Sequence, residues 1–162
     1  MNIEVKQADY RNAKDAQALV DVLNAYACDP MGGGEALSPE VKSKLADSLA
    51  AIPGAFSILV YVDGKAAGLT NCFMGFSTFK CKPLVNIHDV AVMPEFRGLG
   101  LSRLMIDKVE EIARERTCCK ITLEVLEGNT LAQAAYRKFG FSGYELNEAD
   151  GKAMFWEKSL SE

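Results

Sequence analysis

The spacing of hydrophobic and polar positions divides the first third of the chain into a strand and two helices. Residues 2–8 alternate charged with apolar side chains, which predicts a half-buried strand. Apolar side chains recur at helical spacing over residues 13–27, which predicts an amphipathic helix. Ser38–Pro39 is an N-cap residue followed by a proline at the first helical position, so a second helix is expected there, ending at Pro53–Gly54.

The middle of the chain carries the pattern of an antiparallel hairpin. Residues 57–62 and 65–79 are strand-like, and Asp63–Gly64 between them suits a two-residue turn in which both central residues have positive φ. Residues 84–92 predict a further strand. We therefore expect the centre of the sheet to be antiparallel.

Strand and helix patterns alternate in the second half. From Leu101 the apolar positions follow helical spacing, and the opposite face of this helix is charged. Residues 121–126 predict the next strand. Residues 130–133 read Thr-Leu-Ala-Gln, the spacing of a capping box, and predict a short helix that Gly140 closes.

A second hairpin is expected at the end of the chain, where residues 141–146 and 153–160 flank the turn pair Asp150–Gly151. Neither a repeat nor a linker separates these elements, so we expect one domain over residues 1–162. The element order predicts an α/β (α+β) fold with a mixed, mostly antiparallel sheet of about seven strands and about four helices.

Composition narrows the class of protein. The chain has 162 residues, 49% hydrophobic and 25% charged, as in one globular domain. No signal-peptide run and no stretch of ~18 apolar residues is present, so we expect a cytoplasmic protein without a membrane partner. A net charge of −4 without a basic tract argues against nucleic acid as a partner. Five cysteines, an odd number without a C-x-x-C pair, predict reduced thiols and no metal site.

A glycine-containing loop stands between the strand that ends at Val92 and the helix that begins near Leu101. It reads Arg97-Gly98-Leu99-Gly100-Leu101-Ser102. The glycines allow a sharp turn and close approach of the backbone, while successive amides and the helix N-terminus attract an anion. The loop therefore predicts a phosphate site, with a plain tight turn as the competing interpretation. Arg103 replaces the third glycine of a dinucleotide fingerprint, and the Gly-Lys-Ser/Thr of a P-loop is missing.

Two stretches around this loop resemble known motifs. Residues 87–102, Ile-His-Asp-Val-Ala-Val-Met-Pro-Glu-Phe-Arg-Gly-Leu-Gly-Leu-Ser, are similar to the acetyl-CoA motif of the GNAT superfamily, Gln/Arg-x-x-Gly-x-Gly/Ala. Ser102 differs from the Gly/Ala of the last motif position, but because serine is small we expect the backbone of the loop to keep its shape. Residues 129–141 resemble the family's second signature, Asn-x-x-Ala-x-x-x-Tyr followed by Gly-Phe. The resemblance is close over residues 84–144 and uninformative over residues 1–55.

The resemblance implies how acetyl-CoA, the expected co-substrate, would be held. The family's fold has a central parallel pair of strands that splays around the arm of the coenzyme. Backbone groups of the strand would pair with the pantetheine arm, and the loop would hold the pyrophosphate. The residues expected to bind coenzyme are Val90, Ala91, Val92, Arg97, Gly98, Leu99, Gly100, Leu101, Ser102 and Asn129.

Acetyl transfer to an amine needs a group that takes the amine proton and one that protonates the departing thiolate. His88, the only histidine, is a candidate base, and a hydrogen-bonded structural histidine is the equal alternative. Asp89 is a second candidate base, although strand alternation puts it on the opposite face. Tyr136 is the candidate acid implied by the second motif; without that motif it would be read as a core residue. Asn129 is expected either to bind coenzyme or to shape the turn before Thr130.

The sequence thus predicts an N-acetyltransferase that moves an acetyl group from acetyl-CoA to a primary amine. Direct transfer in a ternary complex is expected, because no cysteine has an evident activating base. The resemblance favours a small-molecule acceptor, a polyamine or a lysine-like amine, and a homodimer would suit the family. The alternatives are a non-catalytic acyl-CoA-binding or sensing domain and a protein N-acetyltransferase.

Overall fold

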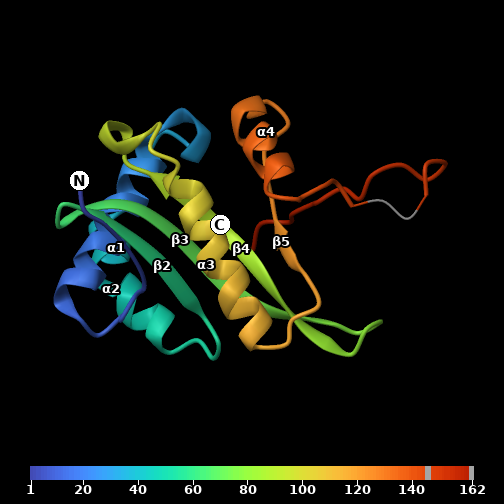
Figure 1. The fold of residues 1–162 in the computed structure, drawn as a ribbon, viewed down its shortest axis with the longest axis horizontal. Coiled ribbons are helices and arrows are strands. Elements are labelled where there is room, and N and C mark those ends of the chain that lie inside the picture. The colour runs from blue at the N-terminus through green and yellow to red at the C-terminus, as the bar shows by residue number, and fades with distance from the viewer. Residues whose placement is uncertain (145–146, 161–162) are drawn as a thin grey trace. The chain divides into compact units, whose positions relative to one another are not determined.

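The computed structural model describes residues 1–144 and 147–160. The chain folds into two compact units, unit 1 from Met1 to Leu126 and unit 2 from Glu127 to Glu162. Unit 1 contains the sheet and the helices that cover it (Figure 1). None of the described helices is long and apolar enough to cross a membrane.

One five-stranded sheet forms the centre of unit 1, with the strands side by side in chain order. Neighbouring strands are antiparallel except for the last pair, which is parallel. The strands are β1 (Ile3–Gln7), β2 (Phe56–Val62), β3 (Lys65–Ser77), β4 (Lys82–Val92) and β5 (Ile121–Leu123). Every residue of β2 is buried, as its nearly continuous apolar sequence Phe-Ser-Ile-Leu-Val-Tyr-Val requires.

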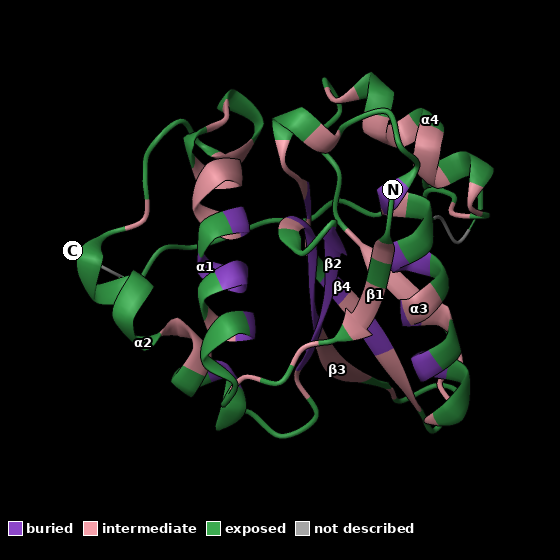
Figure 2. Cartoon of the chain, turned by 60° about the vertical axis from the view of Figure 1, so that its left-hand side comes forward, coloured by how far each residue is buried: buried purple, intermediate pink, exposed green. Residues whose placement is uncertain are grey.

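Helices cover both faces of the sheet. In unit 1 they are α1 (Ala13–Cys28), α2 (Pro39–Ala50), α3 (Leu101–Glu115) and the short 3-10 helices η1 (Pro30–Gly32) and η2 (Pro94–Phe96). On one face, side chains of α1 and α2 form a buried cluster with Leu69 and Ala91 of the sheet. On the other face, Met105 of α3 accepts a hydrogen bond from Thr70. Buried residues accordingly follow the strands and the sheet-facing sides of α1 and α3 (Figure 2).

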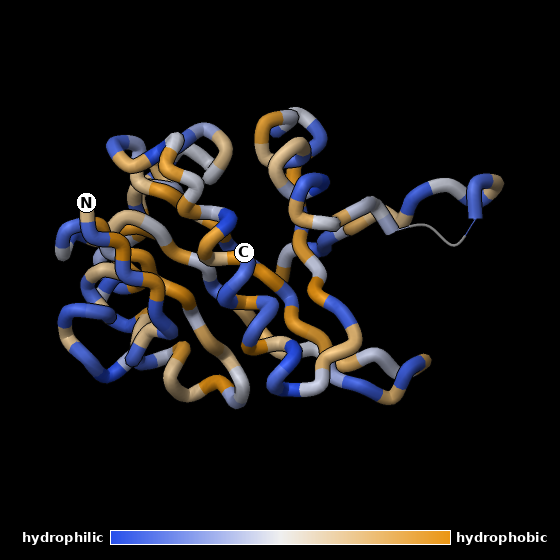
Figure 3. The backbone as a smooth tube through the Cα atoms, in the orientation of Figure 1, coloured by the Kyte–Doolittle hydropathy of each residue, from blue (hydrophilic) through white to orange (hydrophobic). Residues whose placement is uncertain are grey.

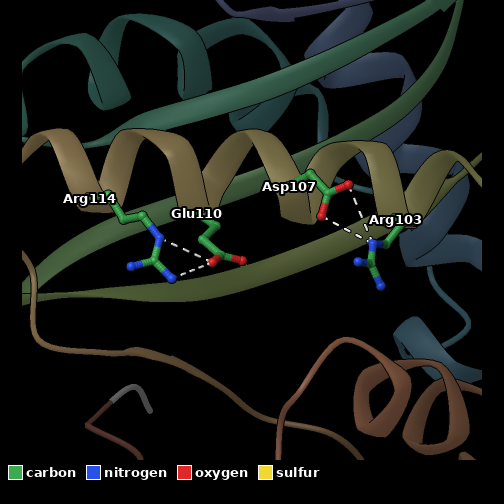
Figure 4. Close-up of polar contacts among 4 residues, drawn as sticks. All are labelled: Arg103, Asp107, Glu110 and Arg114. Atoms are coloured by element: carbon green, nitrogen blue, oxygen red, sulfur yellow. Dashed lines mark hydrogen bonds and ion pairs between the residues drawn. The ribbon is translucent and has the colours of Figure 1, made fainter.

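The helix and turn predictions in unit 1 are confirmed. Ser38 caps α2 by accepting from the Val41 amide. Asp63 and Gly64 have φ of 49° and 80°, as the two-residue hairpin turn demands. The outward face of α3 is charged and carries the ion pairs Arg103–Asp107 and Arg114–Glu110 (Figure 4). Such exposed pairs contribute only about 0.3–0.5 kcal/mol each, so α3 is held mainly by its apolar face.

The prediction of about seven strands is wrong: the described sheet has five. The strand predicted over residues 121–126 ends at Leu123, and the final hairpin is not formed as strands over the described residues. Residues 145–146 of that hairpin lie outside the described part of the chain. The predicted two-residue turn is not formed either, because, of Asp150 and Gly151, only Gly151 has positive φ, 74°. The chain turns instead over Glu148–Gly151, where the Gly151 amide donates to the Glu148 carbonyl over 3.3 Å.

Burial explains why the strands of the final hairpin do not form. The hydrophobic residues expected on the second strand, Met154, Phe155, Trp156 and Leu160, are all exposed. A two-stranded hairpin needs a third strand or a packing layer to bury its apolar face. The burial that these strands would need comes from residues distant in the sequence. Figure 3 shows hydrophobic stretches concentrated along the central strands of the sheet.

Unit 2 contains one helix among its described residues, α4 (Thr130–Lys138). The capping-box prediction placed the N-cap at Thr130, but the cap is Asn129, whose Oδ1 accepts from the Ala132 amide over 3.2 Å. Gln133 does not complete a capping box; its side-chain amide donates to the Glu127 carbonyl. The helix therefore begins one residue earlier than the sequence pattern suggested.

Candidate functional site

Strand β4 contains a bulge at His88. Its register with β3 pairs Asn71 with Asp89 but Cys72 with Ile87, so His88 is an extra residue without a partner on β3. The Val85 amide donates to the backbone carbonyl of Lys120, on the side of β5. The Met93 amide donates to the backbone carbonyl of Ala67, on the side of β3. In a regular strand, residues an even number of positions apart direct their amides to the same side. The bulge therefore turns the backbone amides of the residues after His88 to the side opposite to the one that a regular strand would give them.

This reversal gives β4 backbone groups that point away from β3. Because Met93 faces β3, alternation turns Ala91 toward β3 and turns Val90 and Val92 away from it. The described pairing between β4 and β5 covers Val85 to Ile87 only. Val90 and Val92 thus lie on the part of β4 that extends past its pairing with β5, as expected of a splayed parallel pair. We call this the open edge of β4.

The loop after β4 has the backbone geometry of an anion site. Gly98 and Gly100 have φ of 83° and 75°, in the region that glycine adopts without strain. A Cβ built at either position would meet no atom within 4 Å, so the glycines line open space instead of a packed core. Leu101 behind them is buried and Leu99 is exposed.

The N-terminus of α3 completes this loop. Gly100 is the N-cap residue of the 15-residue helix, and no side chain caps that end. The first-turn amides of Leu101 and Ser102 and the positive end of the helix dipole are therefore oriented toward the loop. The residues fit a pyrophosphate, because this arrangement binds phosphate oxygens through the backbone.

Arg97, expected to add a charge to the loop, is tied to another segment. Its Nη2 lies 3.4 Å from Oδ2 of Asp29, and the two side chains are 58% and 30% exposed. Asp29 also caps η1, because its Oδ1 accepts from the Met31 amide. The pair joins the phosphate loop to the connection between α1 and α2.

His88 and Asp89 lie on the same face of the sheet, contrary to the prediction from alternation. The His88 ring is exposed and meets Phe73 edge-on at 5.4 Å, and Phe73 packs against the cluster under α1. Asp89 is half-buried and close enough to Tyr26 of α1 to act on its pKa. The prediction failed because a bulge interrupts the period-two alternation on which it depended.

Asp89 is the end of a hydrogen-bonded series that we call the Tyr10–Asp89 chain. Its Oδ2 accepts from Asn71 Nδ2 over 3.0 Å, and Asn71 Oδ1 accepts from the Ser57 hydroxyl over 2.6 Å. The Tyr10 hydroxyl lies 2.8 Å from the Ser57 oxygen. Ser57 and Asn71 are 0% and 3% exposed. Burial raises the pKa of Tyr10 and outweighs the hydrogen bond with Ser57, which lowers it, so the phenol stays protonated at neutral pH.

The surroundings of Asp89 are negative on the α1 side. Burial is the largest cause of the raised pKa of Tyr26, and the charges of Asp89 and Asp29 raise it further. Tyr26 donates to the Met31 carbonyl over 3.4 Å. Two carboxylates thus act on one phenol, an environment that attracts a cation.

Unit 2 holds the other two predicted site residues. The Tyr136 ring is half-buried and packs edge-on against Phe139 and Phe141, with centroids 6.5 and 6.1 Å apart. Asn129 uses its Oδ1 to cap α4, which is the turn-shaping role that was the alternative to coenzyme binding. The cap uses only the oxygen of the Asn129 side chain, so coenzyme binding by its amide nitrogen stays a prediction.

The sequence reasoning missed Tyr10, Ser57 and Asn71. A signal for two of them was present, because Ser57 and Asn71 are polar residues inside strands whose neighbours are apolar. A buried polar side chain requires a partner. Only the register of β2, β3 and β4, which aligns Ser57 with Asn71 and Asn71 with Asp89, identifies that partner.

Comparisons with known proteins agree with this geometry. Thialysine N-epsilon-acetyltransferase of Bos taurus is 34% identical over 83 residues, 51% of this chain and 47% of that protein. Streptothricin acetyltransferase of Streptomyces lavendulae is 34% identical over 105 residues, 64% of this chain and 53% of that protein. The chain spans about half the length of these curated relatives.

The fold is also found among solved structures. An aminoglycoside N-acetyltransferase in complex with CoA superposes with a TM-score of 0.74 at 17% identity, covering 97% of this chain and 95% of that one. At this identity the similarity shows the fold alone. Residues 19–141, which include β4, the glycine loop and α4, match the acetyltransferase (GNAT) family. The chain therefore belongs to the GNAT acetyltransferase family.

Proposed function

We propose that the protein is an acetyl-CoA-dependent N-acetyltransferase that acetylates a primary amine of a small molecule. The observation that carries the proposal is the adjacency of the open edge of β4 and the glycine loop that follows it. The edge supplies backbone groups that point away from β3 for an extended amide-containing arm, and the loop supplies an anion site. Acetyl-CoA, when bound, supplies the thioester that is to be transferred.

Each part of unit 1 has a role in holding the coenzyme. Backbone groups of Val90 and Val92 pair with the pantetheine arm, with Ala91 between them fixing the strand against β3. Amides of Gly98, Leu99, Gly100, Leu101 and Ser102 bind the pyrophosphate, and Arg97 adds a positive charge. An amide on the open edge near Val90 donates to the thioester oxygen as charge develops there. Asn129 in unit 2 contributes its side-chain amide.

Proton movement is assigned to His88 and Tyr136. An amine of pKa ~10.4 is protonated near neutrality and must lose a proton before it attacks. The exposed imidazole of His88 takes this proton directly or through water, at the bulge that precedes the open edge. The Tyr136 hydroxyl returns a proton to the departing thiolate. No covalent enzyme intermediate is required.

Two of the five cysteines support direct transfer. Burial raises the pKa of Cys72, and it is also the main cause of the raised pKa of Cys118. Both thiols are thus held in the protonated form, which is a poor nucleophile. A ping-pong route through Cys72 or Cys118 would need the opposite shift.

Release of free thiol from acetyl-CoA is the direct test. The protein is mixed with acetyl-CoA and a panel of diamines, lysine analogues, aminoglycosides and amino-terminal peptides, and the thiol is followed with a chromogenic disulfide. Turnover with small amines supports the proposal, and turnover with peptides alone would transfer it to a protein acceptor. Saturable coenzyme binding without turnover on the whole panel would contradict the enzyme and favour the sensor.

A further inference from the structure

The Tyr10–Asp89 chain has a direction. Ser57 has a single hydroxyl proton and gives it to Asn71 Oδ1, so the proton between Tyr10 and Ser57 must come from the tyrosine. Asn71 then donates its side-chain amide to Asp89. Every donor in the chain therefore points toward the carboxylate.

A directed chain of this kind stabilises a negative charge at its end. Hydrogen bonds in series polarise one another, and their effect is stronger in a buried, weakly polar environment. Donation to the ionised form of a carboxyl group favours that form. The donors of the chain are thus all directed at the negative charge of the Asp89 carboxylate.

The chain also fixes the orientation of Asp89. Oδ2 is engaged by Asn71, whereas Oδ1 accepts no hydrogen bond from the residues that the structure describes. Three buried or half-buried polar side chains in a row across an apolar sheet add little stability over apolar residues of similar shape. Their arrangement instead leaves one oriented, ionised oxygen beside the bulge and the open edge of β4.

We infer that Tyr10, Ser57 and Asn71 are positioning residues that hold Asp89 as an ionised anchor for a cationic group of the acceptor amine. The inference rests on the proposed function and gives the adjacent residues His88 and Asp89 different roles. His88 exchanges a proton, and Asp89 keeps its charge and binds. A substrate with a second ammonium group fits this anchor, since one nitrogen reacts while the other stays charged.

The charged surroundings agree with an anchor for a cation. His88 lies beside Asp89 on β4, and the Asp89 charge reaches Cys72 on β3 and Tyr26 on α1. Burial first, and the Asp89 charge in addition, raise the pKa of both Cys72 and Tyr26. Both groups therefore remain neutral at pH 7, and Asp29, which also acts on Tyr26, adds to the negative charge there.

A matched pair of acceptors tests the anchor. Diaminobutane and aminobutanol have the same reactive amine, but only the first has a second ammonium group. We expect wild-type kcat/KM to favour the diamine by about ten- to a hundredfold, the range of one hydrogen bond to a charged group. Asp89→Asn should reduce this ratio to near one by raising KM for the diamine.

The positioning residues should reduce the same ratio in graded order, with Asn71→Ala largest, Ser57→Ala intermediate and Tyr10→Phe smallest. Tyr61→Phe is the matched control, because the Tyr61 hydroxyl donates over 2.7 Å to a different buried carboxylate, Asp15, on the same face of the sheet. It should leave the ratio unchanged. A wild-type ratio near one, or equal ratios in Tyr10→Phe and Tyr61→Phe, would overturn the inference and leave the acetyltransferase proposal intact.

A second measurement is independent of turnover. Isothermal titration calorimetry compares the binding of diaminobutane and aminobutanol to the protein in the presence of coenzyme A. Wild type should bind the diamine more tightly by about ten- to a hundredfold, and Asn71→Ala should lose most of this preference. An equal preference in wild type and Asn71→Ala would refute the chain even if the protein acetylates nothing.

Discussion

Arg97 and Asp29 join the phosphate loop to the connection between α1 and α2, with 3.4 Å between Nη2 and Oδ2. In the proposed function the coenzyme phosphates compete with Asp29 for the guanidinium. An exposed pair of this kind contributes about 0–1 kcal/mol. Coenzyme therefore displaces Asp29 at small cost, and the freed carboxylate adds to the negative environment of Tyr26.

Asp29→Asn should consequently strengthen binding of coenzyme A by about two- to fivefold, because Arg97 no longer has to leave a partner. Isothermal titration calorimetry measures this. Glu110→Gln, which breaks the exposed pair at the far end of α3, is the control and should leave the affinity unchanged. Weaker binding in Asp29→Asn would mean that the pair orients Arg97 instead of competing for it.

Gly100→Val should weaken coenzyme A binding by about tenfold or more, because a β-branched residue is strained at φ of 75° and its side chain enters the space that phosphate needs. Gly64→Val provides a matched control. Gly64 has φ of 80° and equally open surroundings, but lies in the β2–β3 turn. Both variants should lose similar stability in urea, and only Gly100→Val should lose coenzyme. If Gly100→Val and Gly64→Val bound coenzyme A equally well, the loop would not be the phosphate site.

Tyr136→Phe should lower turnover by ~10²-fold or more while coenzyme binding persists, the usual scale for loss of a general acid. The ring contacts with Phe139 and Phe141 do not involve the hydroxyl, so the packing within unit 2 is kept. Steady-state kinetics with the best amine measures the effect. Wild-type turnover in this variant would make Tyr136 a packing residue and pass the acid role to solvent.

His88→Ala should lower turnover by ~10²-fold or more, the usual scale for loss of a general base. The ring contacts Phe73 at an exposed site, so the fold should tolerate its loss. Comparison with Asp89→Asn separates proton transfer from binding: the first variant should change kcat and the second KM. Wild-type turnover in His88→Ala would assign the proton to water.

Asp15→Asn should lower the free energy of unfolding at pH 7 by about 2–4 kcal/mol. The Asp15 carboxylate is buried and accepts from Lys6, from the Asp9 amide and from Tyr61. Burial alone would raise the pKa of Asp15, but these three bonds outweigh it, and the net pKa is lowered.

The pH dependence follows from the direction of that shift. Because the folded pKa of Asp15 is below the unfolded one, its stabilisation is complete above pH ~4 and is lost as pH falls through the folded value. Urea unfolding of wild type and Asp15→Asn should therefore converge in acid. Asp107→Asn, at an exposed pair on α3, should change stability by less than ~0.5 kcal/mol at pH 7.

Elements with local determinants could be predicted from the sequence. The cap at Ser38, the turn at Asp63–Gly64 and the glycine loop depend on residues within a few positions of each other. The final hairpin depends on a partner for its apolar face, which no local pattern encodes, and its strands are not formed over the described residues. The Tyr10–Asp89 chain depends on register across three strands, so its residues are far apart in sequence.

The bulge at His88 gives β4 an unusual intolerance to changes of length. Before it, the strand directs Val85 to β5; after it, the same spacing directs Met93 to β3. Removing one residue there would rotate the second half of β4 by half a turn, exchanging the groups at the open edge with those bonded to β3. A substitution in this strand changes the contacts of one side chain, whereas deletion of a single codon would change the hydrogen-bond partners of every residue in the second half of β4.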